Sequence, residues 1–220
     1  MERAQVIVIG GEKGGVGKST LCTNIAVELA LQTANVLIMD TDPQKTSINW
    51  IDRRNELINR NENFLKIHGV SKEGNVRDTI KDFSTQYDVI MLDASGRDSK
   101  SLRTALTIAD KFFCPVKPSQ ADLETLPHVC ELVQVSKDIN AKLQSFVVVS
   151  MAPTNHKVRE SDDALSILKD FKNYVGISKN VIMERKVYRD ALLAGKGVIE
   201  LSNQKASNEI KKFVKEMLNA

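Results

Sequence analysis

A glycine-rich segment near the start of the chain carries two lysines and two hydroxyl residues at a spacing that suits phosphate binding. It covers residues 10–20 and reads GGEKGGVGKST. The glycines allow the backbone to curl so that successive N–H groups point at phosphate oxygens. Lys18 is placed to reach the β- and γ-phosphates of a nucleotide, and the Ser19 hydroxyl is placed to ligate Mg²⁺. The segment therefore predicts a nucleoside triphosphate site.

The elements on either side of this segment support that interpretation. Residues 4–9 (AQVIVI) form an apolar run typical of a buried strand, and residues 19–31 have the pattern of a helix. The helix would add the positive end of its dipole to the phosphate site. A glycine-rich turn with its lysines in solvent is the alternative, and the combination of residues, spacing and flanks disfavours it.

Three aspartates stand at the ends of apolar runs. Asp40 and Asp42 follow a predicted strand at 35–40, and Asp93 ends another at 87–93. Ligands of an open parallel sheet bind beyond the carboxyl ends of its strands, so we expect these carboxylates beside the glycine-rich segment. Transfer of a γ-phosphoryl group needs an oriented water and neutralised charge, which such groups help to supply. A simpler role for Asp42, capping a helix that starts at Pro43, is compatible with the first.

Strands and helices alternate along the whole chain. The predicted strands are nearly all apolar, which favours a parallel sheet covered on both faces, in the doubly wound α/β class. A closed barrel of eight strands is disfavoured, because it would not normally carry a phosphate loop after its first strand. We expect one domain over residues 1–220. The predicted strands cover residues 4–9, 35–40, 64–70, 87–93, 111–116, 143–151 and 181–183. The main predicted helices cover 19–31, 74–83, 99–109, 122–140, 159–174, 187–194 and 205–218, and residues 41–44 lead into another helix, through Trp50 and Ile58.

Composition narrows the possible classes. The 220 residues are 42% hydrophobic, and no apolar run approaches the ~20 residues of a membrane-spanning helix. With no signal-peptide pattern at the N-terminus, we expect a cytoplasmic protein. The net charge of +3 is too small by itself to predict nucleic-acid binding. The widely spaced cysteines are expected to be reduced and mostly buried, and the histidines are assigned no chemistry; these residues are Cys22, Cys114, Cys130, His68, His128 and His156.

The phosphate loop departs from the ordinary pattern, because Glu12 stands where a glycine is usual. Residues 13–19 (KGGVGKS) instead resemble the deviant Walker A box of the ParA/MinD family of ATPases. In that family a first, signature lysine, matched here by Lys13, reaches the nucleotide across a dimer interface. The resemblance implies ATP as the nucleotide, Mg²⁺ as the metal, and a homodimer that forms with ATP.

The aspartates extend the resemblance. Residues 40–44 (DTDPQ) resemble the family's switch I box, which implies that Asp42 positions the attacking water and that Asp40 lies near Mg²⁺ through a water. Asp93 matches the Walker B aspartate. The implied catalytic residues are Lys13, Lys18 and Asp42, and the implied metal site comprises Ser19, Asp40 and Asp93. The implied nucleotide contacts are Glu12, Lys13, Gly14, Gly15, Val16, Gly17, Lys18, Ser19, Thr20 and Asp93, with Pro153 where family members contact the adenine ring.

Two further segments match less closely. Residues 94–99 (ASGRDS) replace the family's common Thr-Pro-Pro, although Gly96 still permits a phosphate-sensing loop to move. Arg97 either senses the phosphate or pairs with Asp98, and the sequence leaves both open. Residues 116–123 (VKPSQADL) resemble a family segment at the dimer face. Its plainer interpretation is a proline-stiffened turn in which Asp122 caps a helix.

The last quarter of the chain is basic and resembles the family's closing signature. Family members bind DNA nonspecifically through such residues, and Arg189 and Lys196 are the best candidates here. An ordinary solvated helix face explains the same lysines nearly as well. The final helix carries an apolar stripe that could lie on a membrane but more often packs on the sheet. We favour packing, so a membrane partner is not expected.

These features together predict a small ParA-type ATPase for plasmid or chromosome partition. ATP and Mg²⁺ would drive dimerisation and nonspecific DNA binding on the nucleoid, and a centromere-binding, ParB-like partner would stimulate weak intrinsic hydrolysis. The first strand begins within a few residues of Met1, so no N-terminal DNA-binding extension is expected. The alternatives are a MinD-like positioning ATPase at a membrane and a metabolic P-loop enzyme such as a kinase or an amidoligase.

Overall fold

A seven-stranded sheet forms the centre of the computed structural model, which describes residues 3–96, 98–155 and 160–220. The strand order is β3-β2-β4-β1-β5-β6-β7, and every pairing between these strands is parallel. The predicted doubly wound α/β fold is therefore confirmed. The strands are β1 Gln5–Ile9, β2 Val36–Asp40, β3 His68–Ser71, β4 Val89–Asp93, β5 Lys111–Val116, β6 Gln144–Val149 and β7 Gly176–Ile177.

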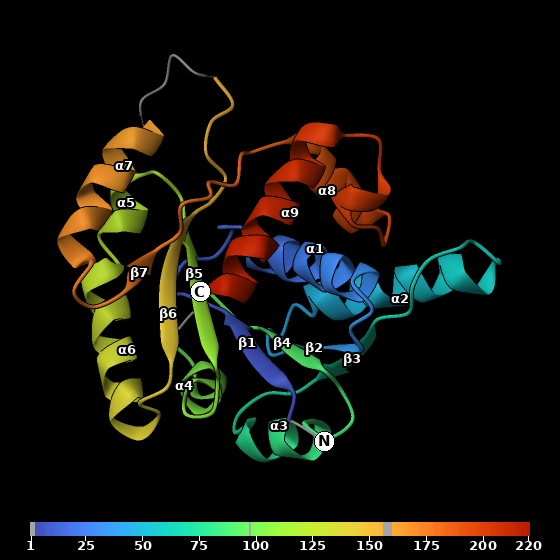
Figure 1. The fold of residues 1–220 in the computed structure, drawn as a ribbon, viewed down its shortest axis with the longest axis horizontal. Helices are drawn as coiled ribbons and strands as arrows, with labels where there is room; N and C mark the ends of the chain where they lie inside the picture. Colours follow the sequence, from blue (N-terminus) through green and yellow to red (C-terminus); the bar gives the residue numbers. More distant parts are fainter. Residues whose placement is uncertain (1–2, 97, 156–159) are drawn as a thin grey trace.

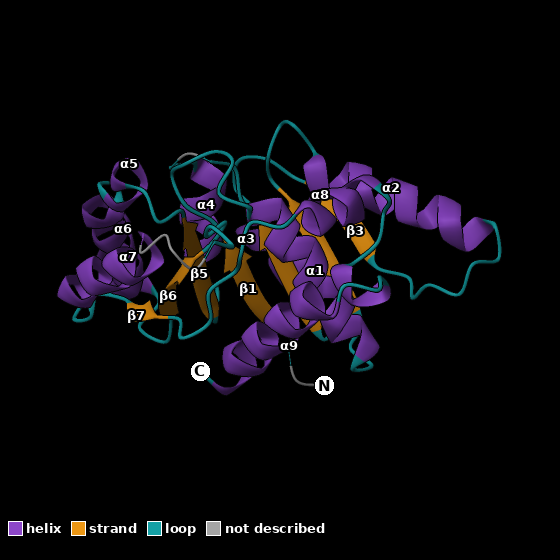
Figure 2. Cartoon of the chain, turned by 90° about the horizontal axis from the view of Figure 1, so that it is seen from above, coloured by secondary structure: helices purple, strands orange, loops and turns teal. Residues whose placement is uncertain are grey.

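Helices cover both faces of the sheet (Figures 1 and 2). One face carries α1 Lys18–Leu31, α2 Thr46–Asn59, α8 Lys186–Leu193, the 3₁₀ turn η2 Val198–Glu200 and α9 Gln204–Asn219. The other carries α3 Arg77–Phe83, α4 Lys100–Leu106, α5 Gln120–Leu123, α6 Leu126–Ile139 and α7 Glu160–Leu168, which continues into η1 Lys169–Phe171.

The central strands are apolar because both of their faces are buried. In β1, Val6 and Val8 pack with the α3–α7 layer, whereas Ile7 and Ile9 pack with the α1 and α9 layer. Alternate side chains of a strand point to opposite faces, so a strand in the middle of the sheet needs apolar residues at every position. This arrangement places the carboxyl ends of β1, β2 and β4 beside one another, where the glycine-rich loop follows β1.

The final helix packs on the sheet, as expected. Most of the apolar side of α9 is buried, with Leu218 the exposed member at 41%, and its Phe213 ring meets the Phe113 ring of β5 at 5.4 Å between centroids. Burial of this side explains the amphipathic pattern without a membrane. No helix among the described residues is long and apolar enough to cross a bilayer. The cysteines are free and buried, also as expected.

The strand predicted at 181–183 is wrong. Met183 makes a single bridge to Ala152, and the strand that pairs with β6 is β7 at 176–177. The chain turns away from β6 after β7, where Glu216 of α9 accepts hydrogen bonds from the 178–180 turn, including the Lys179 N–H at 2.7 Å. It returns at Ile182, whose N–H donates to the Val149 carbonyl at 2.9 Å. These hydrogen bonds to a distant helix cannot be predicted from the local sequence pattern.

Two other predicted elements differ in extent. The helix expected at 122–140 is divided into α5 and α6, because Pro127 lacks an N–H and is tolerated only in the first turn of a new helix. The strand expected at 64–70 is shorter, since the Leu65 carbonyl accepts a hydrogen bond from Arg54 of α2 at 2.8 Å and residues 64–67 lie outside the sheet. The expected helix at 159–174 is described from Glu160 onward and ends in the 3₁₀ turn.

Candidate functional site

The glycine-rich loop presents the bare N-terminus of α1. Gly15 and Gly17 have φ angles of +70° and +90°, a region that favours glycine. Gly17 is the N-cap of α1 and has no side chain that could accept a hydrogen bond from the first-turn N–H groups. Its leading N–H groups are therefore available to an anion, with the helix dipole in their favour.

Lys18 is held in place by its own loop. Its side chain is 7% exposed, and its ammonium donates to the Lys13 carbonyl at 2.6 Å. Burial lowers the pKa of Lys18, while the nearby Asp93 carboxylate opposes that change. A desolvated cation of this kind gains strongly from a phosphate. Lys13, in contrast, is exposed at the rim of the loop.

Asp40 anchors the start of α2 from the end of β2. Its Oδ2 accepts the N–H groups of Ser47 and Ile48 at 2.9 and 3.2 Å, and its Oδ1 accepts that of Asp42 at 3.0 Å. The carboxylate thus satisfies first-turn donors that a helix cannot satisfy itself. Burial raises the pKa of Asp40, and these three hydrogen bonds oppose the rise.

The capping role considered for Asp42 is therefore wrong. The helix begins at Thr46, beyond Pro43, and its N-cap is Lys45 with φ +51°. Asp42 instead accepts the Gln44 N–H at 2.9 Å in a tight turn, with its carboxylate beside the glycine-rich loop. The position remains suited to contact with a phosphate or a water.

Asp93 is the carboxylate with an unused oxygen. It is 1% exposed, and its Oδ2 accepts a hydrogen bond from the Ser47 hydroxyl at 2.7 Å. Its Oδ1 has no hydrogen-bond partner among the described residues. Burial, with the adjacent Asp40 charge, raises the pKa of Asp93 to about 7. A buried acceptor of this kind is costly unless a ligand or ion meets it.

Two adjoining cavities lie above these residues. The first, of about 420 Å³, is lined by residues 14, 15 and 17–20 of the loop together with Asp42, Gln44, Gly96, Met151 and others. The second, of about 640 Å³, extends past Gly96 and the 41–44 turn toward Glu73 and Ser99. A Cβ built on Gly96 would lie 3.0 Å from the Gly14 nitrogen, so the loop after β4 packs directly on the phosphate loop.

The sequence of the chain matches a known family of ATPases. The family model described as "ATPase MipZ" matches residues 5–216. The chain belongs to the MipZ family of ATPases. This MipZ-family chain is 24% identical over 220 residues to maintenance of carboxysome distribution protein A from Halothiobacillus neapolitanus, covering 98% of the chain and 97% of the relative. It is 26% identical over 184 residues to the protein ParA from Rhizobium radiobacter, covering 83% of the chain and 80% of the relative.

Solved structures agree on the fold. Apo McdA from Cyanothece superimposes with a TM-score of 0.80 at 19% identity, covering 98% of this chain and 99% of that one. The MinD cell division protein from Aquifex aeolicus gives a TM-score of 0.75 at 22% identity, covering 99% and 98%. Together with the family match over residues 5–216 and the relative named ParA, these structures confirm the resemblance to the ParA/MinD family, and the MipZ-family chain is an ATPase.

A further pocket of the MipZ-family chain shares Gly17, Thr20 and Met151 with the first cavity. Thr20, Met151, Tyr188 and Arg189 are among its lining residues, and Met151 has a φ of +54°, rare for a residue with a side chain. Pro153, predicted to contact the base, is not among the residues that line this pocket. Of the other predicted nucleotide contacts, Val16 is buried and Glu12 points toward α6.

Sequence patterns assign no role to His128, yet it joins three segments at the site. Its Nε2 lies 3.1 Å from Glu12 Oε1 and 3.4 Å from Asp98 Oδ2, and its Nδ1 lies 3.6 Å from Glu131. Asp98 also pairs with Arg103. The two roles considered for Arg97 are not tested, because this residue lies outside the described ones.

In the segment 116–123, Ser119 is the N-cap of α5. Asp122 accepts the Ser119 hydroxyl at 2.7 Å instead of capping the helix itself.

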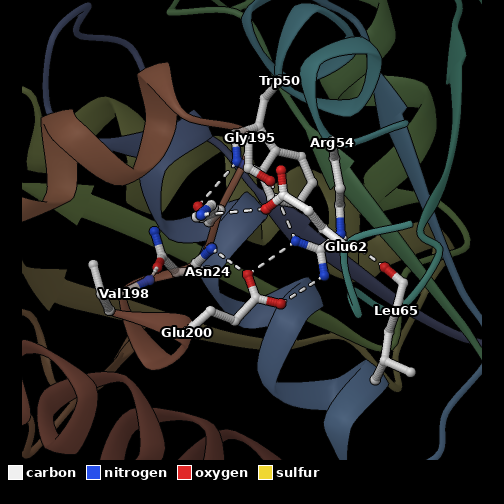
Figure 3. A network of polar contacts seen from close by, with 10 residues as sticks. Asn24, Trp50, Arg54, Glu62, Leu65, Gly195, Val198 and Glu200 are labelled. Carbon is white, nitrogen blue, oxygen red and sulfur yellow. Dashed lines mark hydrogen bonds and ion pairs between the residues drawn. The ribbon is translucent and has the colours of Figure 1, made fainter. Parts of the chain in front are cut away.

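A buried polar network ties α2 to the C-terminal segment (Figure 3). The Arg54 guanidinium donates to both Glu200 carboxylate oxygens and to the Gly195 carbonyl, and the Trp50 indole donates to the Lys196 carbonyl at 3.1 Å. Sequence patterns did not indicate this network.

The network also positions Lys196, one of the two residues predicted to bind DNA. The Lys196 ammonium lies over the Phe64 ring at 4.9 Å and 3.9 Å from Glu62, and its side chain is 26% exposed. Arg189 is 62% exposed and lies 3.2 Å from Glu184. Of the two, Arg189 is thus the more accessible cation.

Proposed function

We propose that this chain is a partition or positioning ATPase of the ParA type. ATP and Mg²⁺ would convert it to a dimer that binds DNA nonspecifically, and a partner on the cargo would stimulate hydrolysis and release. The chain matches the relative named for carboxysome distribution along nearly its whole length, and it also matches a relative named ParA. Both names support a role in distributing a cargo. Membership of the MipZ family favours this function over a metabolic P-loop enzyme.

The contrast between two lysines of one loop is the observation that carries the proposal. Lys18 is buried and aimed into the loop, where it would bind the phosphates of its own nucleotide. Lys13 is exposed beside the same loop. A second cation adjacent to an anion site but turned to solvent suits a nucleotide held by another subunit. Dimerisation would then depend on ATP, so nucleotide state and oligomeric state form one switch.

The remaining site residues would complete the hydrolytic centre. Asp42, beside the phosphate loop, would orient the attacking water. Ser19 and Asp93 would hold Mg²⁺ directly or through water, and the unpartnered Asp93 Oδ1 supports this fit. When bound, Mg²⁺ would neutralise charge that develops on the transferred phosphoryl group. Asp40 lies beside this site, but its oxygens already accept three backbone N–H groups, which favours an anchoring role for it.

Binding to DNA is favoured over binding to a membrane. Ile210, Phe213, Val214 and Met217 of α9 are buried against the sheet, which leaves only a small apolar surface at Leu218 for lipid. Arg189 is an exposed cation on α8, beside the site. Contacts to phosphate backbones release counterions, so binding would weaken steeply as salt rises.

Fluorescence anisotropy with a labelled random-sequence duplex tests this function. We expect binding with ATP and Mg²⁺ and little binding with ADP, and we expect Arg189→Ala to weaken it about tenfold. Lys142→Ala, which removes an exposed lysine elsewhere, is the matched control and should leave affinity within twofold. Equal DNA binding with ADP and ATP, or ATP-dependent sedimentation with liposomes but not with DNA, would contradict the proposal.

A further inference from the structure

Ser47 lies between the two strand-end aspartates, in the first turn of α2. Its side chain is fully buried, at 0% exposure. Its backbone N–H donates to Asp40 Oδ2 at 2.9 Å, and its hydroxyl donates to Asp93 Oδ2 at 2.7 Å. Asp40 and Asp93 are direct neighbours in the register of β2 and β4. Ser47 therefore connects two adjacent carboxylates.

The two carboxylates differ in what they leave free. Asp40 uses both oxygens to accept the backbone N–H groups of Asp42, Ser47 and Ile48. Asp93 accepts the hydroxyl of Ser47 on Oδ2, and its buried Oδ1 lacks a hydrogen-bond partner among the described residues. An unsatisfied buried oxygen persists where a ligand completes it. The oxygen of this pair that remains available to a ligand is thus Asp93 Oδ1.

The surroundings of Asp93 indicate what would complete it. Asp93 pairs with Ile9 in the register of β4 and β1, so it lies at the strand end where the phosphate loop that carries Lys18 and Ser19 begins. Hydroxyl and carboxylate oxygens are ligands that Mg²⁺ prefers, directly or through its waters. With Oδ2 held by Ser47, rotation of the carboxylate about its Cβ–Cγ bond would break a buried hydrogen bond.

We propose that Ser47 is a positioning residue for magnesium: its hydroxyl holds Asp93 Oδ2 so that Oδ1 faces the ion beside Ser19. This inference rests on the proposed function, in which Asp93 serves Mg²⁺. Hydrogen bonds that orient metal-binding carboxylates commonly change metal affinity by about ten- to a hundredfold. Loss of the Ser47 hydroxyl should therefore weaken Mg²⁺ binding while leaving the phosphate loop intact.

Titration of Mg²⁺ into the full chain with a fluorescent ADP tests the role of Ser47. In wild type, Mg²⁺ should strengthen ADP binding. In Ser47→Ala, the Mg²⁺ concentration at half-maximal effect should rise about tenfold, while ADP affinity in EDTA stays within twofold of wild type. If the alanine variant fails to fold, Ser47→Cys is nearly isosteric but a weak donor, and it should shift the midpoint in the same direction.

Ser136→Ala is the matched control, because Ser136 is also buried on a helix and donates its hydroxyl to the Leu132 carbonyl at 2.7 Å. It should lower the melting temperature of the free chain about as much as Ser47→Ala without moving the Mg²⁺ midpoint. An unchanged midpoint in the folded Ser47 variant would overturn this inference alone. A wild-type chain whose ADP affinity ignores Mg²⁺ would overturn the proposed magnesium role as well.

Discussion

Arg54 and Glu200, separated by 146 residues, form a buried bidentate ion pair with N–O distances of 2.9 and 2.7 Å. The Arg54 side chain is 1% exposed and that of Glu200 is 11% exposed. The pair joins α2, which starts directly after the 40–44 box, to the 3₁₀ turn that precedes α9 (Figure 3). The phosphate side of the site and the basic C-terminal segment are thereby parts of one packed unit.

Breaking this pair should strongly destabilise the fold. Arg54→Met leaves the Glu200 carboxylate buried without its partner, and Glu200→Gln leaves Arg54 in the same state. We expect each to lower the free energy of unfolding by about 3–5 kcal/mol, as is typical when one charge of a buried pair is removed. The double variant Arg54→Met/Glu200→Leu should cost less than the sum of the two. Urea unfolding followed by circular dichroism measures this, and additive losses would argue against a coupled pair.

The contact between Gly195 and α2 gives a second prediction. Gly195 has a φ of +68°, and a Cβ there would lie 2.6 Å from the Arg54 backbone nitrogen. Gly195→Ala should therefore cost about 3 kcal/mol or more, through backbone strain and overlap together.

Gly74→Ala is its control, because Gly74 has a similar φ of +80° but open space around the added methyl. It should cost about 1 kcal/mol, the conformational penalty alone. Equal losses in the two variants, measured by urea unfolding, would show that the overlap at Gly195 relaxes freely.

Local patterns predicted the phosphate loop and the strand-end aspartates because these depend on short spacings between flanking elements. Parallel pairing then brings Asp40 and Asp93 together, as the topology requires. The roles that escaped prediction depend on partners far away in the chain. Asp40 caps a helix that starts later than expected, and the Arg54–Glu200 pair has no periodicity that could reveal it. The contact of His128 with Glu12 likewise needs the folded position of α6.

The two lysines of the phosphate loop should have separable roles. Lys18→Ala should weaken binding of both ADP and ATP by at least about a hundredfold, because it removes a desolvated phosphate contact. Lys13→Ala should keep ADP affinity within about threefold but lose the ATP-dependent dimer. Calorimetric titration and size-exclusion chromatography measure these effects. Equal loss of ADP binding in both variants would place Lys13 in its own subunit's site.

The raised pKa of Asp93, about 7, predicts how the stability of the nucleotide-free chain depends on pH. The Asp93 carboxyl binds a proton more tightly in the folded chain than in the unfolded chain, where its pKa is about 4. This stabilisation is therefore complete below pH 4 and is lost as pH rises through 7. From pH 5 to 8, wild type should lose about 3 kcal/mol relative to Asp93→Asn, at about 1.4 kcal/mol for each pKa unit.

Urea unfolding of both chains across that range checks the prediction. Asp78→Asn, which changes an exposed aspartate, should follow wild type throughout. A constant difference between wild type and Asp93→Asn from pH 5 to 8 would mean that Asp93 is already ionised at the lower limit.

We propose that this ATPase is a switch in which bound ATP produces a dimer. Light scattering coupled to size-exclusion chromatography of Asp42→Ala, with Mg²⁺ and either ATP or ADP, tests it most directly. Loss of the Asp42 carboxylate should block hydrolysis and trap the ATP form, so we predict a stable dimer of about twice the 24.5 kDa chain mass with ATP and a monomer with ADP. A monomer in both nucleotides, under conditions where ATP binding is verified, would contradict the claim.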